Sequence, residues 1–245
     1  MIPQERTLWQ AAWLLTEPGR RAFTAYRPLF LGIQGTAAAL LAVYFMSPDV
    51  RRACDVLVGW KDAGGTPFVV VSCILSGGVI PELLKWRLRP PGLPRPTLPE
   101  LAHQMAIFGI CGLMVNEFYK LQGLWFGPAH GWGILLLKIF IDQFIYSLFL
   151  PNPLVIVWFL WREKGFDLAA TMRAVRPGLI RERLMPLWVT GLVFWVPLLL
   201  VLYSLPVGLQ FVAFLLANCA WGILMVFIAR RQVDAPGVRD SRLAK

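Results

Sequence analysis

Six long apolar stretches constrain the fold of this chain more than any other feature of its sequence. A helix needs about 18 to 20 predominantly apolar residues to cross the hydrocarbon core of a bilayer. The chain is 57% hydrophobic and 16% charged, whereas a soluble domain is usually about 45–50% apolar and about 25% charged. We therefore expect an all-α fold, a polytopic transmembrane helical bundle. The predicted spans are Pro28–Ser47, Pro67–Leu84, Leu101–Tyr119, Trp132–Leu150, Leu187–Tyr203 and Gly208–Ala229.

The distribution of basic residues predicts the orientation of these spans. If both termini face inside, the inner segments hold nineteen Lys and Arg residues, the outer segments hold four, and Lys138 lies within the membrane. This asymmetry follows the positive-inside rule. The net charge of +10 therefore indicates orientation, and we expect no nucleic-acid partner. Basic residues beside the bilayer also attract anionic headgroups, so the sequence predicts six spans, N and C termini inside, and anionic lipids bound at the inner face.

The sequence divides into a membrane domain with two flanking segments. Residues 1–27 are interpreted as an N-terminal interfacial segment, residues 28–229 as a single transmembrane helical domain, and residues 230–245 as a basic C-terminal tail. Trp9 and Trp13 fall on one face of an amphipathic helix that suits the interface. The stretch Asp167–Arg176 has the same character, and ordinary helices packed on the bundle are the alternative for both.

A cation, an anion and an amide interrupt the fourth span. Lys138 and Asp142 are four residues apart and share a helical face, and Gln143 lies beside that face. A charge at membrane depth costs at least about 2.5 kcal/mol on insertion scales, so chains rarely keep one without a partner or a function. These residues are the primary candidates for a functional site.

Two polar residues near the outer end of the third span extend this group. Asn116 and Glu117 should lie at a depth similar to that of Lys138 on an adjacent antiparallel helix, given a rise of about 1.5 Å per residue. The five residues could line a polar path that opens to the outside. The alternative is a buried polar network that only holds the bundle together, since interhelical hydrogen bonds stabilise membrane bundles by about 0.6–2 kcal/mol each.

The sequence offers no constellation typical of an enzyme. The four cysteines are far apart, the two histidines stand alone, and the glycine-rich pieces lie inside apolar helices. We expect no catalytic residue, no metal and no cofactor. An enzyme acting on lipid, with Asp142 or Glu117 as acid or base, stays open as a third reading.

The residues Lys138, Asp142 and Gln143, in the order Lys-x-x-x-Asp-Gln before an apolar stretch, resemble a motif of the Mpv-seventeen and peroxisomal membrane protein (twenty-two kilodalton) family. That family carries Gly-Pro-x-x-His-x-Trp-Tyr in the preceding helix. The chain keeps the glycine and the tyrosine there as Gly112 and Tyr119. It has Phe for Trp, and Leu and Asn for Pro and His.

A second family motif lies near the C-terminus. It reads Trp-Pro-x-x-Gln-x-x-Asn-Phe-x-x-Val-Pro, then Arg and Trp. The chain has Trp195 and Pro197, Leu-Tyr at the Asn-Phe position, Pro206, Gln210 in place of Arg, and Trp221. The spacing from Pro206 to Trp221 matches. The resemblance covers about residues 70–230, so the chain resembles a divergent member with an additional first span.

The resemblance implies a small helical protein of an inner mitochondrial, peroxisomal or bacterial membrane that forms a channel for small solutes or metabolites. It carries over to Lys138, Asp142, Gln143, Tyr119, Trp195 and Trp221, and we expect the two tryptophans to serve packing.

We therefore expect an integral membrane channel or pore for small hydrophilic solutes, with a possible homo-oligomer. The alternative is a structural scaffold that binds anionic lipid or a partner. The expected location is a bacterial inner (plasma) membrane, with the mitochondrial inner membrane as the alternative, because the chain has the positive-inside pattern and no recognisable presequence.

Overall fold

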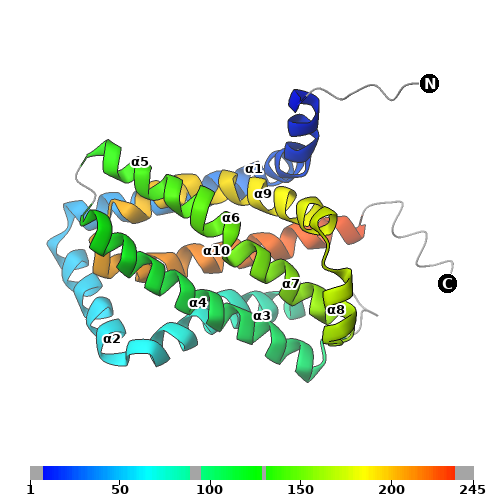
Figure 1. Cartoon of the computed structure of the whole chain (residues 1–245). Helices are drawn as coiled ribbons and strands as arrows, with labels where there is room; N and C mark the ends of the chain where they lie inside the picture. The colour runs from blue at the N-terminus through cyan, green and yellow to red at the C-terminus, as the bar shows by residue number, and fades with distance from the viewer. Residues whose placement is uncertain (1–7, 89–94, 129–130, 235–245) are drawn as a thin grey trace. The chain divides into compact units, whose positions relative to one another are not determined.

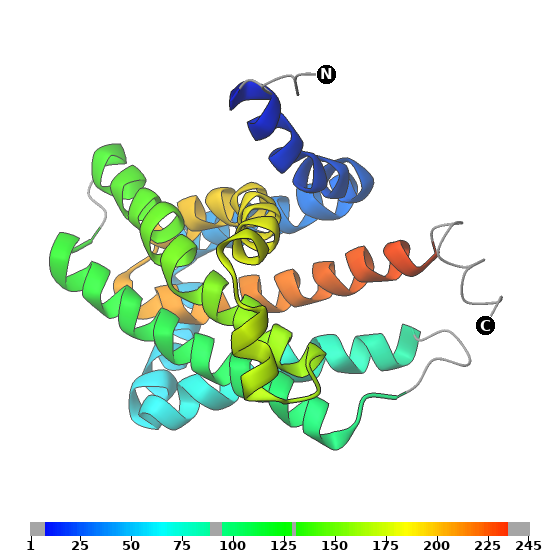
Figure 2. The same ribbon diagram turned by 45° about the vertical axis from the view of Figure 1, so that its right-hand side comes forward.

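The described part of the chain is helical, as predicted. The computed structural model describes residues 8–88, 95–128 and 131–234 and contains no strand in these ranges. The described helices are drawn in Figures 1 and 2. Two π-helical turns, named η1 and η2, interrupt them. The elements are α1 (Leu8–Met46), α2 (Pro48–Cys73), η1 (Ile74–Val79), α3 (Ile80–Leu88), α4 (Leu98–Phe126), α5 (Trp132–Phe140), η2 (Ile141–Tyr146), α6 (Ser147–Phe149), α7 (Pro151–Glu163), α8 (Leu168–Ala174), α9 (Pro177–Tyr203) and α10 (Val207–Asp234).

Within the described ranges, five helical stretches are long and apolar enough to cross a membrane, and they contain or overlap the last five predicted spans. These stretches are Pro48–Leu84, Leu98–Phe126, Trp132–Glu163, Pro177–Tyr203 and Val207–Leu224. The first predicted span falls in α1, whose apolar part Phe30–Met46 is shorter. The inward orientation of both termini stays a prediction.

The two predicted flanking segments are described only in part. Their boundaries, at residues 27 and 230, fall inside α1 and α10. Residues 1–7 and 235–245, and the side chains of Trp9 and Trp13, lie outside the described residues. The interfacial role of the N-terminal segment therefore stays a prediction.

Capping residues explain where several helices begin and end. The hydroxyl of Ser47 accepts a hydrogen bond from the backbone N–H of Val50 at 3.3 Å and starts α2. Thr97 and Glu100 form a capping box at the start of α4, in which the Thr97 N–H donates to Glu100 Oε2 at 2.8 Å. Gly127, with φ +62°, ends α4 in a conformation that favours glycine.

Two predicted spans continue further than the sequence indicated. The predicted outer segment before Pro67 is helical, and only Gly65, with φ +52° and ψ −139°, breaks it. Pro67 follows this break because proline is tolerated in the first turn of a helix. The fourth span bends at Leu150 and continues as α7, with Pro151 in its first turn. In both places a proline lies in the first turn of the helical segment that follows the break.

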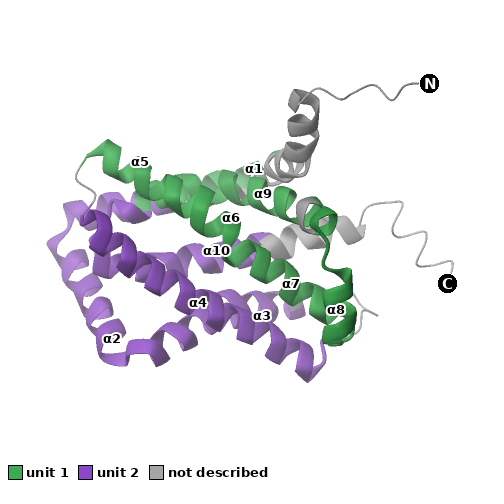
Figure 3. Ribbon diagram, viewed as in Figure 1, with its two compact units in different colours: residues 1–34, 129–201 green, residues 35–128, 202–245 purple. Residues whose placement is uncertain are grey.

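The helices form two compact units, which are described separately (Figure 3). Unit 1 comprises Met1–Gln34 and Ala129–Val201, and unit 2 comprises Gly35–Pro128 and Leu202–Lys245. The sequence predicted a single domain over residues 28–229 and gave no sign of this division.

Unit 2 is held by close approach of helix backbones at glycines. The segment α2–η1–α3 packs against both α4 and α10. A side chain at Gly112 would meet Cys73, and one at Gly222 would meet Pro81, with Cβ contacts of 2.5 Å in each case. Small residues allow such contacts between membrane helices, where packing replaces the hydrophobic effect as the main attraction.

Contacts from α9 to two other helices, α1 and α7, stabilise unit 1. The Gln34 amide donates to the carbonyl of Phe194 at 2.9 Å, and the ring of Phe30 meets that of Phe194 edge-on at 6.1 Å. At the other end of α9, Arg183 donates two hydrogen bonds of 2.8 Å to the two carboxylate oxygens of Glu163 in α7. These contacts place α9 against the helix that carries the candidate site.

Replacing Gly112 by alanine is expected to destabilise the protein by about 1–3 kcal/mol, because the new methyl group overlaps Cys73 and overpacking has a cost of this order. Thermal unfolding of the purified protein in detergent measures the change.

Gly59→Ala is the matched control, since nothing lies within 4 Å of a Cβ at that helical position. It should be neutral or stabilising by up to about 1 kcal/mol. Equal melting temperatures for the two variants would contradict the close packing of α2 against α4.

Candidate functional site

The motif residues of the fourth span lie at a π-helical turn in unit 1. Lys138 is in the last turn of α5, and Asp142 and Gln143 lie within η2. A π-turn widens the helix by one residue, and such turns are often found at functional sites. The polar residues were predicted from the sequence, but the change from α-helix to π-helix was not.

All three side chains are buried. The exposed fractions are 0% for Lys138, 5% for Asp142 and 4% for Gln143. Burial of a lysine in an apolar helix is costly, so its surroundings must stabilise it or it must serve a function. This burial is compatible with both readings of the sequence, a polar path and a buried polar network.

Short hydrogen bonds connect the polar groups of the turn. The amide of Gln143 donates to Asp142 Oδ1 at 2.7 Å, and the hydroxyl of Ser147 donates to the same oxygen at 3.4 Å. Two neutral donors thus surround the carboxylate. Asp142 is the centre of this small network.

Helix α9 supplies a residue that the sequence analysis missed. The indole N–H of Trp188 donates to the backbone carbonyl of Gln143 at 2.7 Å, and its ring meets Phe144 edge-on at 5.2 Å. In η2 the N–H of Ser147 bonds the carbonyl of Asp142, five residues earlier, so the hydrogen-bond ladder is displaced at this point. The only signal in the sequence was an indole donor, which needs a partner when buried in an apolar helix.

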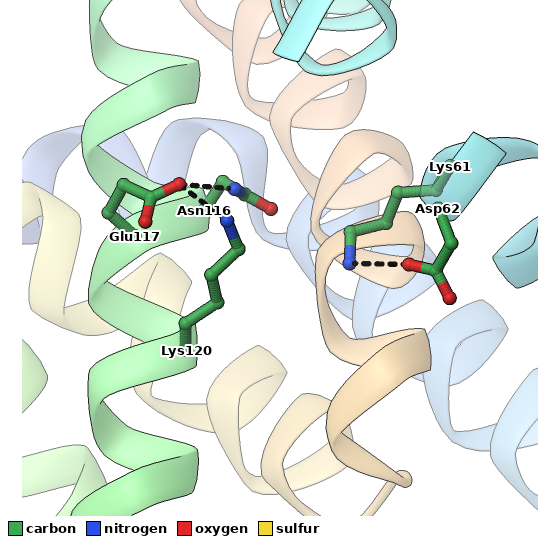
Figure 4. Close-up of polar contacts among 5 residues, drawn as sticks. All are labelled: Lys61, Asp62, Asn116, Glu117 and Lys120. Atoms are coloured by element: carbon green, nitrogen blue, oxygen red, sulfur yellow. Dashed lines mark hydrogen bonds and ion pairs between the residues drawn. The ribbon is translucent and has the colours of Figure 1, made fainter. Parts of the chain in front are cut away.

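The predicted outer pair, Asn116 and Glu117, lies in unit 2. Asn116 is buried, with 5% of its surface exposed, whereas the Glu117 side chain is 60% exposed. Glu117 Oε1 accepts hydrogen bonds from the Asn116 amide at 2.8 Å and from the Lys120 ammonium at 2.7 Å (Figure 4). The predicted proximity of this pair to Lys138 stays a prediction, because the two groups belong to different units.

A second lysine of unit 2 lies in the same close-up. Lys61 has a side chain that is only 12% exposed, and its ammonium lies 3.7 Å from Asp62 Oδ1 (Figure 4). It also lies 5.9 Å from the centre of the Phe211 ring, within the range of a cation–π contact. The sequence analysis had counted Lys61 only as one of the outer basic residues.

Tyr119 contributes to the core of unit 2. It is 4% exposed, and its ring meets those of Tyr203 and Phe214 edge-on at 5.6 Å and 6.0 Å. Gly112 in the same helix provides the close contact with Cys73. These two motif residues serve packing.

The other motif residues lie in α9, in α10 and at the turn between them. Trp195 stacks edge-on against Phe194 at 5.1 Å, Pro197 is exposed within α9, and Trp221 is half-buried in α10. The Pro206 carbonyl accepts the Leu209 N–H at 2.9 Å. The packing role that we expect for the two tryptophans stays a prediction.

The side-chain amide of Gln210 stabilises the turn between α9 and α10. The fully buried Gln210 donates to the carbonyl of Leu205 at 3.0 Å. This amide therefore fixes the chain between α9 and α10.

The described residues hold no group of three or more His, Cys, Asp or Glu side chains that could bind a metal ion. The four cysteines are free thiols, and Cys73 is buried at the contact with Gly112. The functional groups at and just before η2 are the ammonium of Lys138, the carboxylate of Asp142 and the amide of Gln143. They can interact with a solute through hydrogen bonds and charge.

Replacing Asp142 by leucine should destabilise the protein by about 1–3 kcal/mol, because the Gln143 and Ser147 donors would lose their acceptor in a buried place. Asp142→Asn keeps an acceptor oxygen and should cost less. Unfolding of the purified protein in mixed micelles measures both.

Asp55→Leu serves as the control, since Asp55 is exposed in α2 and exposed substitutions usually change stability by less than about 0.5 kcal/mol. A leucine at 142 that is tolerated as well as one at 55 would show that Asp142 does not hold the η2 network.

Comparison with known proteins gives no match: no family model, no curated protein and no solved structure matches this chain. The resemblance to the Mpv-seventeen and peroxisomal membrane protein family stays a prediction from the motif residues.

Proposed function

We propose that this chain passes small hydrophilic solutes across a membrane along a polar path built on the η2 turn. Its five long apolar helical stretches are those of an integral membrane protein. The observation that carries the proposal is the fully buried Lys138 beside the buried Asp142 and Gln143, in the middle of a stretch that can span a bilayer. The expected membrane is the bacterial inner membrane.

The cost of these groups supports a functional role. A lysine at the centre of a membrane helix costs at least about 2.5 kcal/mol, whereas an interhelical hydrogen bond gains only about 0.6–2 kcal/mol. An apolar side chain at 138 would therefore serve stability at least as well. A lysine at position 138 therefore needs a reason other than stability, and contact with a solute in the path provides one.

The position and chemistry of the groups suit a polar solute. Lys138 and Asp142 lie six and ten residues beyond Trp132, which is about 9 Å and 15 Å at a rise of about 1.5 Å per residue, near the middle of a core about 30 Å thick. An ammonium, a carboxylate and an amide can replace the hydration of solutes of either charge. This mixture favours weak selectivity.

Proteoliposomes that contain the purified protein test the path. Lys138→Met should raise the permeability of cations relative to anions, and Asp142→Asn should lower it. Each change should be about tenfold or more, because a unit charge about 4 Å from an ion contributes about 4 kcal/mol at an effective dielectric constant of about 20. Conductance and release of loaded solutes measure both.

Lys164→Met is the matched control for charge, because Lys164 is an exposed lysine just after α7. Its permeability ratio should equal that of the unchanged protein. Shifts in the same direction for Lys138→Met and Asp142→Asn, or a silent bilayer with folded protein, would refute the path.

Helix α8 favours a second function, a membrane scaffold that holds anionic lipid. This helix forms within the stretch predicted to be interfacial, Asp167–Arg176. Its apolar residues Leu168 and Met172, four positions apart, are 64% and 50% exposed, and Arg173 and Arg176 are exposed as well. An exposed apolar pair beside basic residues is typical of a helix that lies on a membrane surface.

The scaffold function predicts that Arg173→Gln with Arg176→Gln lowers the retention of anionic lipid by the purified protein about tenfold or more, because each basic residue near such a surface contributes about 1 kcal/mol. Native mass spectrometry measures the bound lipid. Arg51→Gln with Arg52→Gln, two basic residues predicted to lie outside, is the control. Equal losses in the two double variants would contradict a site at α8.

A further inference from the structure

We propose that unit 2 carries a second polar membrane site, formed by Ser76 and Asn218, that corresponds to the site of Asp142 and Gln143 in unit 1 and takes neutral hydroxyl or amide groups of the solute. This inference deepens the proposed function and rests on it. It follows from a comparison of two helical segments, residues 65–84 and 131–150. They agree in backbone conformation, in the positions of polar residues and in burial, although their sequences differ.

The backbones of the two segments follow the same course. Each starts at a glycine with positive φ, Gly65 at +52° and Gly131 at +84°. Each then runs as an α-helix into a π-helical turn, which begins nine residues after the first glycine and ten residues after the second, at Ile74 and Ile141. Interrupted helices at corresponding positions of internal repeats are typical of the binding sites of membrane transporters.

The polar residues occupy corresponding positions. Ser72 and Ser76 lie seven and eleven residues after Gly65, and Lys138 and Asp142 lie seven and eleven residues after Gly131. Each residue of the first segment thus precedes its counterpart by 66 positions. The three residues between each polar pair are apolar in both segments.

The burial of the two segments matches as well. Val69 and Leu135 are 2% and 7% exposed at corresponding positions, and Cys73 and Ile139 are 1% and 5% exposed one helical turn later. Ser76 and Asp142 follow at 7% and 5%. The same face of each helix is therefore buried through the π-turn, although the two segments belong to different units.

In each unit, a later helix supplies a side chain that bonds the π-turn. The Asn218 amide of α10 donates to the Ser76 hydroxyl at 3.1 Å, and both residues are buried. In unit 1 the Trp188 indole of α9 donates to the Gln143 carbonyl at 2.7 Å. The hydroxyls of Ser72 and Ser76 both donate to carbonyls of their own helix, that of Phe68 at 2.6 Å and that of Cys73 at 3.4 Å. Ser76 differs in that it also accepts the bond from Asn218.

The chemistry of the second site differs from that of the first. A hydroxyl and a carboxamide both donate and accept hydrogen bonds and carry no charge. A Cβ at Gly77, beside Ser76, would overlap the Phe108 ring and lie 2.6 Å from Asn218 Nδ2, so the glycine is what lets these two side chains approach the π-turn. A solute rich in hydroxyl or amide groups, such as a polyol, therefore suits this site better than an ion.

Labelling of single introduced cysteines in proteoliposomes tests the proposal. Ser76→Cys and Asp142→Cys are treated with a water-soluble thiosulfonate, and the modified peptides are identified by mass so that the native cysteines stay in place. Both positions should react at least about tenfold faster than two controls, Val71→Cys and Leu137→Cys. These controls are also 66 positions apart, and they are 54% and 41% exposed on apolar faces. Only a thiol that water reaches forms the reactive thiolate.

The outcomes separate this inference from the proposed path. Reaction at 142 without reaction at 76 would overturn the second site and leave the path of unit 1 intact. Reaction at 76 alone would support the second site and refute the path at Asp142. Reaction at neither would refute both. Glycerol should slow the labelling of Ser76→Cys severalfold and sodium chloride should not; the reverse result would overturn the assignment of neutral solutes.

Discussion

The lack of water in the core of a membrane is the constraint on which the rest of this structure depends. Every backbone N–H and C=O group in a spanning segment must find its partner inside the protein, and the described residues accordingly form helices. The π-turns η1 and η2 displace the helical hydrogen-bond ladder, so groups at these turns can be bonded from elsewhere. The indole of Trp188 does so at the Gln143 carbonyl, and Asn218 bonds Ser76. At both π-turns, another helix of the same unit thus supplies a polar contact.

The two units solve the packing problem with different side chains. In unit 2, glycines let helix backbones approach closely, as at Gly112 beside Cys73. In unit 1, hydrogen bonds and an ion pair connect the helices, as between Arg183 and Glu163. Both solutions follow from the weakness of hydrophobic attraction between helices in lipid. Polar groups that hold the bundle can then also meet a solute, since the same donors and acceptors serve both purposes.

The sequence located the centre of the candidate site because a buried charge in a span is costly and therefore conspicuous. It could not distinguish Asn116 from its neighbour Glu117, although the first is buried and the second exposed. Adjacent residues point about 100° apart on a helix, so their environments depend on which face packs. It also missed Trp188, because its partner Gln143 is 45 residues away and no local pattern connects them.

The sequence by itself determined the helical class, the positions of the apolar stretches and the polar interruption at Lys138, Asp142 and Gln143. These features follow from hydropathy and the cost of charge in lipid, which depend on composition along the chain. Only the tertiary structure decided where the helices turn into π-turns and which later helix bonds each of them. Those outcomes depend on contacts between segments far apart in the chain, such as Trp188 with Gln143 and Asn218 with Ser76, and no local pattern of residues encodes such contacts.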